Sequence, residues 1–240
     1  MQMYQILALN CLISAYSMSA LYLKGIKMGE TQMTISGMGT AFIFMALSWA
    51  QPVKELSPER PYARIFSPWM VLTVLLQFSI HLFSLVTAVN MALPHTPTDS
   101  ETLSPEGKFA PNLLNTTVWL VSTAMTVATF LANYRGRPFM QSLTEHAPLK
   151  KMLFGLLGLI AVLALEVMPD INLAMELVPS PSTEYQLSLC ALIAFNVIAS
   201  VGVGKGLARY FAKVPEQQQQ QTVVVEKKAT GSNVPVAKKD

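Results

Sequence analysis

The first 23 residues of this 240-residue chain carry no charged side chain, yet polar side chains occur throughout them. A helix of roughly 20 predominantly apolar residues spans the ~30 Å hydrocarbon core of a bilayer. Uncharged polar side chains in such a helix offer hydrogen bonds to groups inside the membrane. The segment therefore predicts a membrane helix that enters lipid and also makes polar contacts. Its polar residues are Gln2, Gln5, Asn10, Ser14, Tyr16, Ser17 and Ser19.

Five more stretches repeat this low-charge pattern, at 31–50, 69–93, 113–134, 152–168 and 185–204. Across all six stretches the only formal charge is Glu166. A charge at the bilayer centre costs about 2.5–3.5 kcal/mol on insertion scales, so membrane spans exclude it. A soluble helical bundle would need charged outer faces, which no stretch has. We therefore expect an all-α, polytopic membrane helix bundle with six transmembrane helices.

Basic residues predict the orientation of these helices. Of the 17 lysines and arginines, 14 fall in the connections at 51–66 and 135–151 or after residue 204. The other side has Lys24, Lys27 and Lys108 among several acidic residues. By the positive-inside rule the basic side is cytosolic. Both termini are thus expected in the cytosol, with 91–111 and 169–184 in the lumen.

The composition changes near residue 211. A run of glutamines at 217–221 is followed by a tail rich in valine, lysine and alanine, with little apolar surface to bury. Such a segment predicts disorder. We therefore divide the chain into a transmembrane domain over 1–211 and a disordered cytosolic tail over 212–240.

Polar residues inside the predicted helices form stripes. Asn10, Ser14 and Ser17 share one narrow face of the first helix, since successive residues are 100° apart. An amide and two hydroxyls near mid-membrane favour a cavity, so these three are candidate substrate-pathway residues.

Two other stripes favour hydrogen bonds between helices, worth about 0.6 kcal/mol each on average. A lone membrane histidine such as His81 is more often a hydrogen-bonded strut than a ligand. We interpret Gln77, His81, Thr126 and Asn133 as polar support of this kind. The full stripes are Thr73, Gln77, His81 and Ser84, and Asn115, Ser122, Thr126, Thr129 and Asn133.

Several catalytic motifs are missing from the sequence. It contains no phosphate-binding glycine loop, no Asp-Lys-Thr-Gly phosphorylation motif and no HExxH pair. No residue pattern indicates covalent catalysis, a metal site or a nucleic-acid partner. The chain alone is not expected to bind ATP tightly or to form a phosphoenzyme.

The first two predicted helices carry a specific run of residues between Asn10 and Gly37. This run resembles the fifth and sixth membrane helices of the type V-A P-type ATPases, the endoplasmic-reticulum pumps regarded as transmembrane-helix dislocases. The resemblance extends over about residues 2–211. Its residues include Tyr4, Leu7, Asn10, Tyr16, Gly25, Lys27, Gly29, Gln32, Thr34, Gly37, Pro52, Gln77, His81, Asn115, Asn133, Pro138, Glu166, Asn172 and Pro179.

The resemblance implies that the chain is similar to the C-terminal six helices of a larger, ATP-driven pump. It implies a multi-pass protein of the endoplasmic reticulum membrane whose substrate is a transmembrane helix and whose partners are lipid and the N-terminal part of the pump. ATP and magnesium are implied for the full-length relative, with no cofactor in this chain. The pathway would be lined by Asn10, Ser14 and Ser17, with Gln32 near its lumenal mouth.

Some residues depart from the family's pattern. Asn196 occupies a position where an intramembrane aspartate is expected, and we group it with the polar support. Lys108 replaces an acid and Thr126 a glutamine, while Trp49-Ala50-Gln51 replaces a basic pair. Met1 aligns inside a helix, so the expectation is that the chain corresponds to a piece of a longer pump.

Three other functions stay open. A cation-transporting P-type ATPase would place carboxylates in the first two helices, because hard ions prefer charged oxygen ligands. Those helices have none, and Glu30 lies at the water edge between them. A stand-alone six-helix solute transporter would show internal repeats, and we find none. A structural membrane subunit without transport function is the third.

Overall fold

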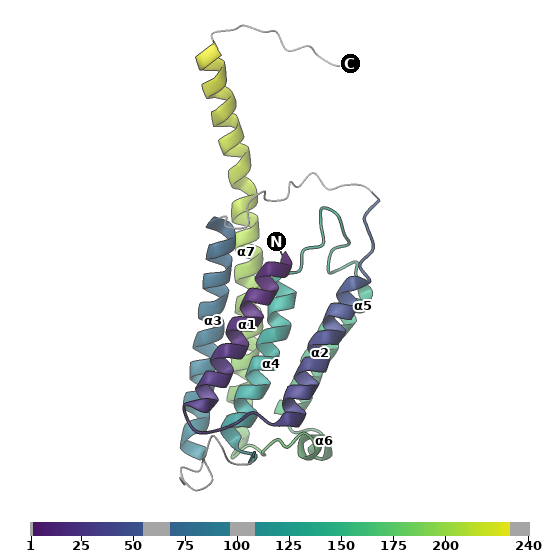
Figure 1. Cartoon of the computed structure of the whole chain (residues 1–240), viewed down its shortest axis with the longest axis vertical. Helices are drawn as coiled ribbons and strands as arrows, with labels where there is room; N and C mark the ends of the chain where they lie inside the picture. The colour runs from purple at the N-terminus through teal and green to yellow at the C-terminus, as the bar shows by residue number, and fades with distance from the viewer. Residues whose placement is uncertain (1, 55–67, 97–108, 231–240) are drawn as a thin grey trace.

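The computed structural model describes residues 2–54, 68–96 and 109–230, and these residues form a bundle of helices (Figure 1). Within this part of the chain the only strand-like pairing is a single bridge between Pro52 and Met140. An all-α fold is thus confirmed. The helices are α1 (Gln2–Tyr22), α2 (Glu30–Ser48), α3 (Pro68–Ala92), the 3₁₀ turn η1 (Leu93–His95), α4 (Leu113–Asn133), α5 (Ala147–Ala164), α6 (Pro169–Ala174) and α7 (Thr183–Thr230).

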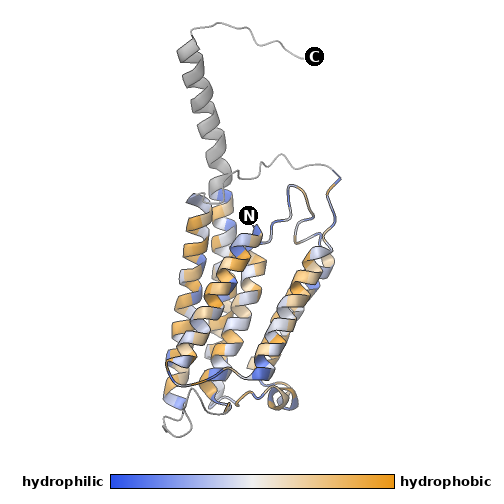
Figure 2. Ribbon diagram, in the orientation of Figure 1, coloured by the Kyte–Doolittle hydropathy of each residue, from blue (hydrophilic) through white to orange (hydrophobic). Residues whose placement is uncertain are grey.

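Five helical segments are long and apolar enough to cross a membrane. They are α1, α3 with η1, α4, α5 and the first part of α7, Thr183–Tyr210. The helix α2 is 19 residues long but is not among them. Its Thr, Ser, Gly and Gln residues lower its mean hydropathy, and its first turn is hydrophilic in Figure 2. The membrane character of five of the six expected helices is supported, and the count of six stays a prediction.

The centre of the bundle is α4. It packs against α1, α3, α5 and α7, and 83% of its span is buried, against 22–33% for the other four candidate spans. Small and hydroxyl-bearing residues such as Thr117, Ala124 and Ala128 allow its neighbours to approach closely. Large apolar side chains on the other helices point outward, for example Leu75, Phe83 and Ile198. Such an exposed apolar surface suits contact with lipid tails.

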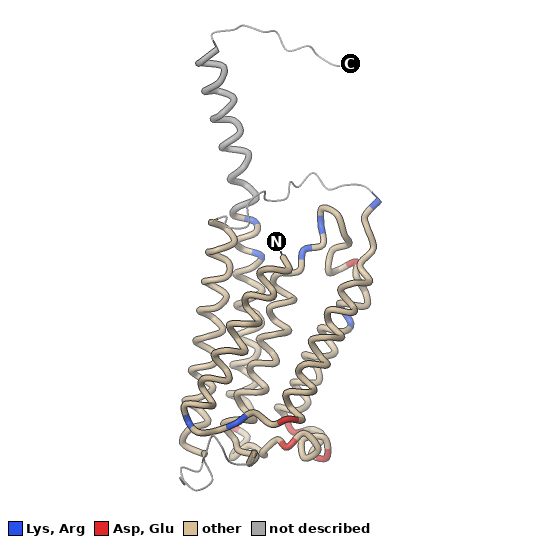
Figure 3. Tube along the Cα trace, viewed as in Figure 1, with Lys and Arg blue, Asp and Glu red and all other residues tan. Residues whose placement is uncertain are grey.

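Charged residues lie at the two ends of the bundle (Figure 3). Lysines and arginines gather where α1 begins and where α7 leaves the bundle, while most acidic residues lie at the opposite end, with Lys24 and Lys27. The described residues therefore follow the sorting seen in the sequence. Arg60, Arg64 and Lys108 lie outside the described residues. The cytosolic location of both termini stays a prediction.

The last helix is longer than the sequence predicts. Residues 212–230, expected to be a disordered tail, continue α7 as helix to Thr230. Extending an existing helix costs no new nucleation, and Gln, Ala, Lys and Glu are favourable helix residues, whereas Pro215 opposes the extension. The domain boundary at residue 212 stays a prediction.

The connection between α4 and α5 is folded onto the segment after α2. The N–H of Val53 donates to the carbonyl of Phe139 at 3.1 Å, and the N–H of Gln141 donates to the carbonyl of Gln51 at 3.0 Å. The side chain of Gln2 accepts from the N–H of Arg135 at 3.0 Å. These bonds join α1, α2 and α4 at the end of the bundle where α1 begins.

Candidate functional site

A cavity of about 370 Å³ lies between α1, α2 and α4. Its walls combine hydroxyl groups with methionine, isoleucine and tryptophan side chains. Of the predicted residues, Ser14, Ser17 and Thr126 line it. The complete lining is Ile13, Ser14, Ser17, Met18, Met28, Met33, Ser36, Gly37, Thr40, Trp119, Ser122, Thr123 and Thr126.

Two polar atoms on the predicted stripe of α1 have no hydrogen-bond partner among the described residues. They are the hydroxyl of Ser17, which is 2% exposed, and the side-chain oxygen of Asn10. Asn10 is half-buried and does not line the cavity. An unpaired buried polar group costs roughly 1–3 kcal/mol, so the Ser17 hydroxyl is suited to donate or accept a bond, and the Asn10 oxygen to accept one, when a guest or water enters. The stripe thus carries unused hydrogen-bonding capacity beside the cavity.

Three threonine hydroxyls of the cavity already donate to their own helices. Thr40 donates to the carbonyl of Ser36 at 2.9 Å, Thr123 to that of Trp119 at 2.7 Å and Thr126 to that of Ser122 at 3.1 Å. Their oxygens keep free lone pairs facing the space. The cavity therefore offers weak acceptors and apolar surface rather than strong charges.

Gln32, predicted at the lumenal mouth, serves as a junction between elements. Its side-chain oxygen accepts from Asn115 Nδ2 at 2.8 Å, and its Nε2 donates to the carbonyl of Met175 at 3.3 Å. The indole N–H of Trp119 donates both to the carbonyl of Gln32 at 3.1 Å and to Ser36 Oγ at 2.8 Å. Gln32 is fully buried and does not line the cavity, but it holds Trp119 and thus one cavity wall in place.

Gln77 and Asn133 face each other between α3 and α4. Asn133 Nδ2 donates to Gln77 Oε1 at 2.8 Å, and Gln77 Nε2 donates to Asn133 Oδ1 at 3.2 Å. Both residues are at most 2% exposed. In a reciprocal amide pair each side chain both donates and accepts a hydrogen bond inside an apolar bundle. This arrangement agrees with a role in joining helices.

His81 and Asn196 form a second junction, between α3 and α7. The side-chain oxygen of Asn196 lies 3.2 Å from His81 Nδ1, and its Nδ2 donates to Ser84 Oγ at 2.9 Å. Thr129 of α4 lies 3.5 Å from His81 Nε2. Four of the predicted support residues are thus paired between helices, whereas the fifth, Thr126, faces the cavity. The functional roles of all these residues stay predictions.

The sequence reasoning did not find Trp119, Ser36 or the three methionines of the lining. Trp119 could have been found, because a buried indole N–H needs an acceptor. Ser36 could also have been found, since it lies four residues after Gln32 on the same helical face. Met18, Met28 and Met33 come from three different segments, so no periodic pattern connects them.

Comparison with known proteins relates the chain to large membrane ATPases. It is 43% identical over 181 residues to a protein of Arabidopsis thaliana named as a probable manganese-transporting ATPase, PDR2, and the match covers 75% of this chain. It is 43% identical over 198 residues to the endoplasmic reticulum transmembrane helix translocase spfA of Aspergillus fumigatus, covering 81% of the chain. It is 41% identical over 215 residues to the endoplasmic reticulum transmembrane helix translocase of Schizosaccharomyces pombe, covering 88%.

The chain is a relative of the type V-A P-type ATPases. It spans only 15–17% of the length of these three relatives. No protein-family model matches it. The names of the type V-A relatives, together with the five apolar helices, support the expected location in the endoplasmic reticulum membrane.

Proposed function

We propose that this chain forms the C-terminal membrane part of an ATP-driven type V-A pump that moves transmembrane helices out of or across the membrane. The cavity between α1, α2 and α4 is the part of the pathway that this chain supplies. Ser14 and Ser17 line it, Asn10 continues the same face of α1, and Gln32 supports its wall. ATP and magnesium act in the remainder of the pump, because these 240 residues contain no phosphate-binding motif.

The observation that carries the proposal is the chemistry of the cavity. Its lining mixes hydroxyl oxygens with methionine and tryptophan, and among the described residues no carboxylate contributes to it. A guest helix presents apolar side chains with occasional polar ones, which such a surface accommodates. The unpaired hydroxyl of Ser17 adds a hydrogen bond for a polar side chain of that guest, while the unpaired oxygen of Asn10 lies on the same face of α1 outside the lining.

The proposal includes six spans with both termini in the cytosol. At 1.5 Å per residue, α2 is about 28 Å long, close to the thickness of the hydrocarbon core. It runs beside α5 and along the bundle in Figure 1. Some of its polar residues face the cavity or other helices, as Gln32 and Ser36 do, which allows a span of low hydropathy.

A chimera tests this function. Residues 2–211 would replace the aligned segment of the Schizosaccharomyces pombe translocase, and the purified chimera would be reconstituted in lipid with a single-span peptide helix. We expect Ser17→Leu and Asn10→Leu to fold and to lose about tenfold of the peptide-stimulated ATP turnover, because leucine fills the cavity or removes the polar face.

Ser79→Leu is the matched control. Ser79 is exposed on α3, donates to its own helix at Leu75 and does not line the cavity. It should leave stimulation unchanged. If Asn10→Leu lowers the free energy of unfolding by about 1 kcal/mol while stimulation stays normal, the stripe is only a packing contact and the pathway assignment is wrong.

Cation transport is the second candidate, because one relative is named as a probable manganese-transporting ATPase. The cavity disfavours it, since divalent cations prefer carboxylate ligands and the described lining offers hydroxyls and thioethers. In the chimera, manganese-stimulated ATP turnover without any response to peptide helices would favour this candidate. A stand-alone solute carrier or structural subunit gains no support from the relationship to P-type ATPases.

A further inference from the structure

A second cavity, of about 610 Å³, adjoins the first at the end of α1. It is mostly apolar, and Lys27 contributes to its edge. Its lining is Met18, Ser19, Leu21, Tyr22, Leu23, Ile26, Lys27, Met28 and Met33. It lies where α1 turns into α2, at the end of the bundle that is predicted to face the lumen.

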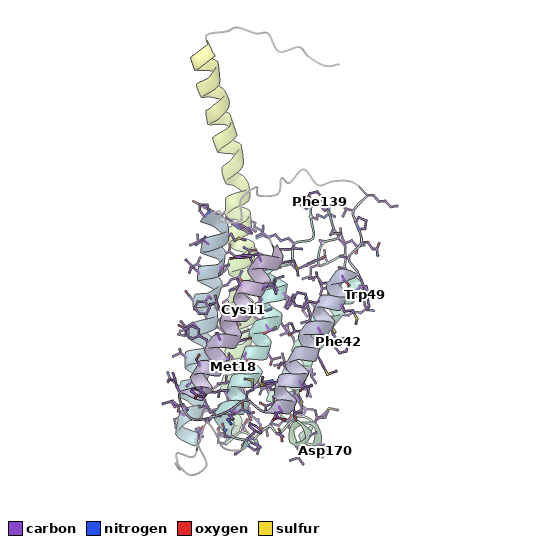
Figure 4. The ribbon with its side chains drawn as sticks, in the orientation of Figure 1. Cys11, Met18, Phe42, Trp49, Phe139 and Asp170 are labelled. Atoms are coloured by element: carbon purple, nitrogen blue, oxygen red, sulfur yellow. The ribbon has the colours of Figure 1, made fainter. Side chains whose placement is uncertain are left out.

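The two cavities share three lining residues, and all three are methionines. Met18 comes from α1, where it is labelled in Figure 4. Met28 comes from the connection, and Met33 comes from the first turns of α2. Three long, unbranched side chains therefore lie between the hydroxyl-lined cavity and the apolar one. We call these residues the methionine neck.

Methionine differs from the other large apolar residues in ways that matter here. It has three rotatable side-chain bonds and a polarisable thioether, so it fits differently shaped partners with similar contact quality. Met18 and Met33 are each 45% exposed, which leaves their side chains room to change rotamer. The walls behind them are more rigid, because Trp119 and Ser36 are fixed by their hydrogen bond and Ile13 is β-branched and buried.

We propose that the methionine neck sets the range of side chains accepted from a guest helix that occupies both cavities. This inference rests on the proposed function, and its guest is an apolar transmembrane segment from another protein. The mobile thioethers seal around small or large apolar side chains alike, so one site accepts many sequences. A rigid neck of similar volume would accept fewer.

Site-specific photo-crosslinking tests the location of the guest. The full chain would be reconstituted in lipid nanodiscs, with benzoylphenylalanine at position 33 and a biotinylated 21-residue helix of leucine, alanine and serine as the probe. We expect about fivefold more adduct from position 33 than from position 38 or 45. Met38 and Met45 are matched controls, because they are comparably exposed methionines of α2 that line neither cavity.

A substitution series tests the adaptability. The probe is made in a leucine-rich and a phenylalanine-rich form, and adducts are collected from benzoylphenylalanine at position 14. With the native neck, the adduct yields of the two probes should differ by less than about twofold. With Met18, Met28 and Met33 all changed to isoleucine, the adduct yield of the phenylalanine-rich probe should fall about fivefold relative to that of the leucine-rich probe. When the same three residues are changed to leucine, which is unbranched at Cβ, the difference in adduct yield should lie between those of the native and isoleucine necks.

The outcomes separate the two proposals. Adducts from position 14 but equal labelling at 33, 38 and 45 overturn the neck and leave the pathway intact. If the native and isoleucine necks discriminate equally between the two probes, the proposed role of the neck is also wrong. No adduct above background from position 14, 33, 38 or 45 with either probe contradicts the proposed function itself, and the neck with it.

Discussion

At the scale of single residues, Gly136 shows how a loop position can be fixed by geometry alone. Its φ is +62°, in the left-handed region that side chains with a Cβ rarely adopt. A Cβ added there would lie 1.8 Å from the carbonyl oxygen of Gln141. That same segment forms the hydrogen bonds to Gln51 and Val53 that join the two loops. Glycine at this position therefore allows the end of α4 to connect to the end of α2.

Gly136→Ala should consequently lower the free energy of unfolding by about 1–3 kcal/mol, through backbone strain and displacement of Gln141. Gly155→Ala is the matched control. Gly155 lies within α5 with open space around its Cα, so alanine there should be neutral or stabilising by up to about 1 kcal/mol. Unfolding of both variants in bicelles measures the difference, and equal stability of the two would contradict the role of Gly136.

Glu145 provides a residue-scale test that depends on pH. The backbone N–H of Ser142 at 2.9 Å and the guanidinium of Arg137 at 2.6 Å both bond its carboxylate and lower its pKa. A carboxyl whose pKa is lowered by folding stabilises the folded state above its ordinary pKa. That stabilisation is lost as the pH falls through the lowered value.

The stability difference between the native chain and Glu145→Gln should thus be constant near neutral pH and shrink in acid, below the ordinary glutamate pKa. Because Glu145 is exposed, the effect is small and should also shrink with added salt. Melting temperatures of both proteins from neutral to acidic pH measure it. A difference that grows toward acid would have the wrong sign for this contact.

At the scale of helices, the sequence predicts which segments are apolar but not how they meet. The six low-charge stretches correspond to α1–α5 and the first part of α7, because exclusion of charge from lipid acts on each segment alone. Helical spacing also placed Gln77 and His81 on one face of α3. Their partners Asn133 and Asn196 could not be assigned, since pairing depends on how three helices pack. The same limit applies to the methionine neck and to Trp119.

The short helix α6 illustrates the same limit. Pro169 begins it and Asn172 Nδ2 donates to the carbonyl of Leu163 at 3.1 Å, which folds the segment back against the end of α5. Nothing in its six residues is periodic enough to predict a helix. Glu166, the charge within the fifth stretch, lies after α5 and accepts from the N–H of Ser180 at 2.6 Å. It therefore lies outside the helix and bonds to the loop between α6 and α7.

The amide pair of α3 and α4 gives a prediction at this scale. Gln77→Leu or Asn133→Leu alone removes the side-chain partner of one buried amide and should cost about 1–3 kcal/mol. The double substitution should cost less than the sum by about 0.6–2 kcal/mol, because it removes both polar groups together. Gln77→Leu with Ser79→Ala is the additive control, since Ser79 is exposed and bonds only within its own helix. Additivity of the first pair would mean that the observed bonds contribute nothing.

At the scale of the whole molecule, the two ends of the bundle differ in charge and in the residues that they carry. The basic connections lie at the end where α1 begins, and the methionine neck lies at the opposite end, near Lys24, Lys27 and the acidic residues of the α5–α7 connection. If the basic end is cytosolic, the neck opens toward the lumen. Asn115 begins the Asn-Thr-Thr glycosylation sequon of this sequence; it is fully buried and donates to Gln32, so the folded bundle does not offer it for glycosylation.

Cysteine labelling decides this orientation. In a chain with Cys11→Ser and Cys190→Ser, a membrane-impermeant maleimide added to sealed microsomes should label Gln220→Cys and spare Ser100→Cys. Detergent should then make the second position reactive, which serves as the control for its chemical accessibility. The expectation follows from the 14 of 17 basic residues on one side, since each lysine or arginine resists transfer across the membrane during insertion. Labelling of Ser100→Cys alone in sealed vesicles would mean that the bundle has the opposite orientation in the membrane. The neck would then open toward the cytosol, and a pump with this chain would take guest helices from the opposite side.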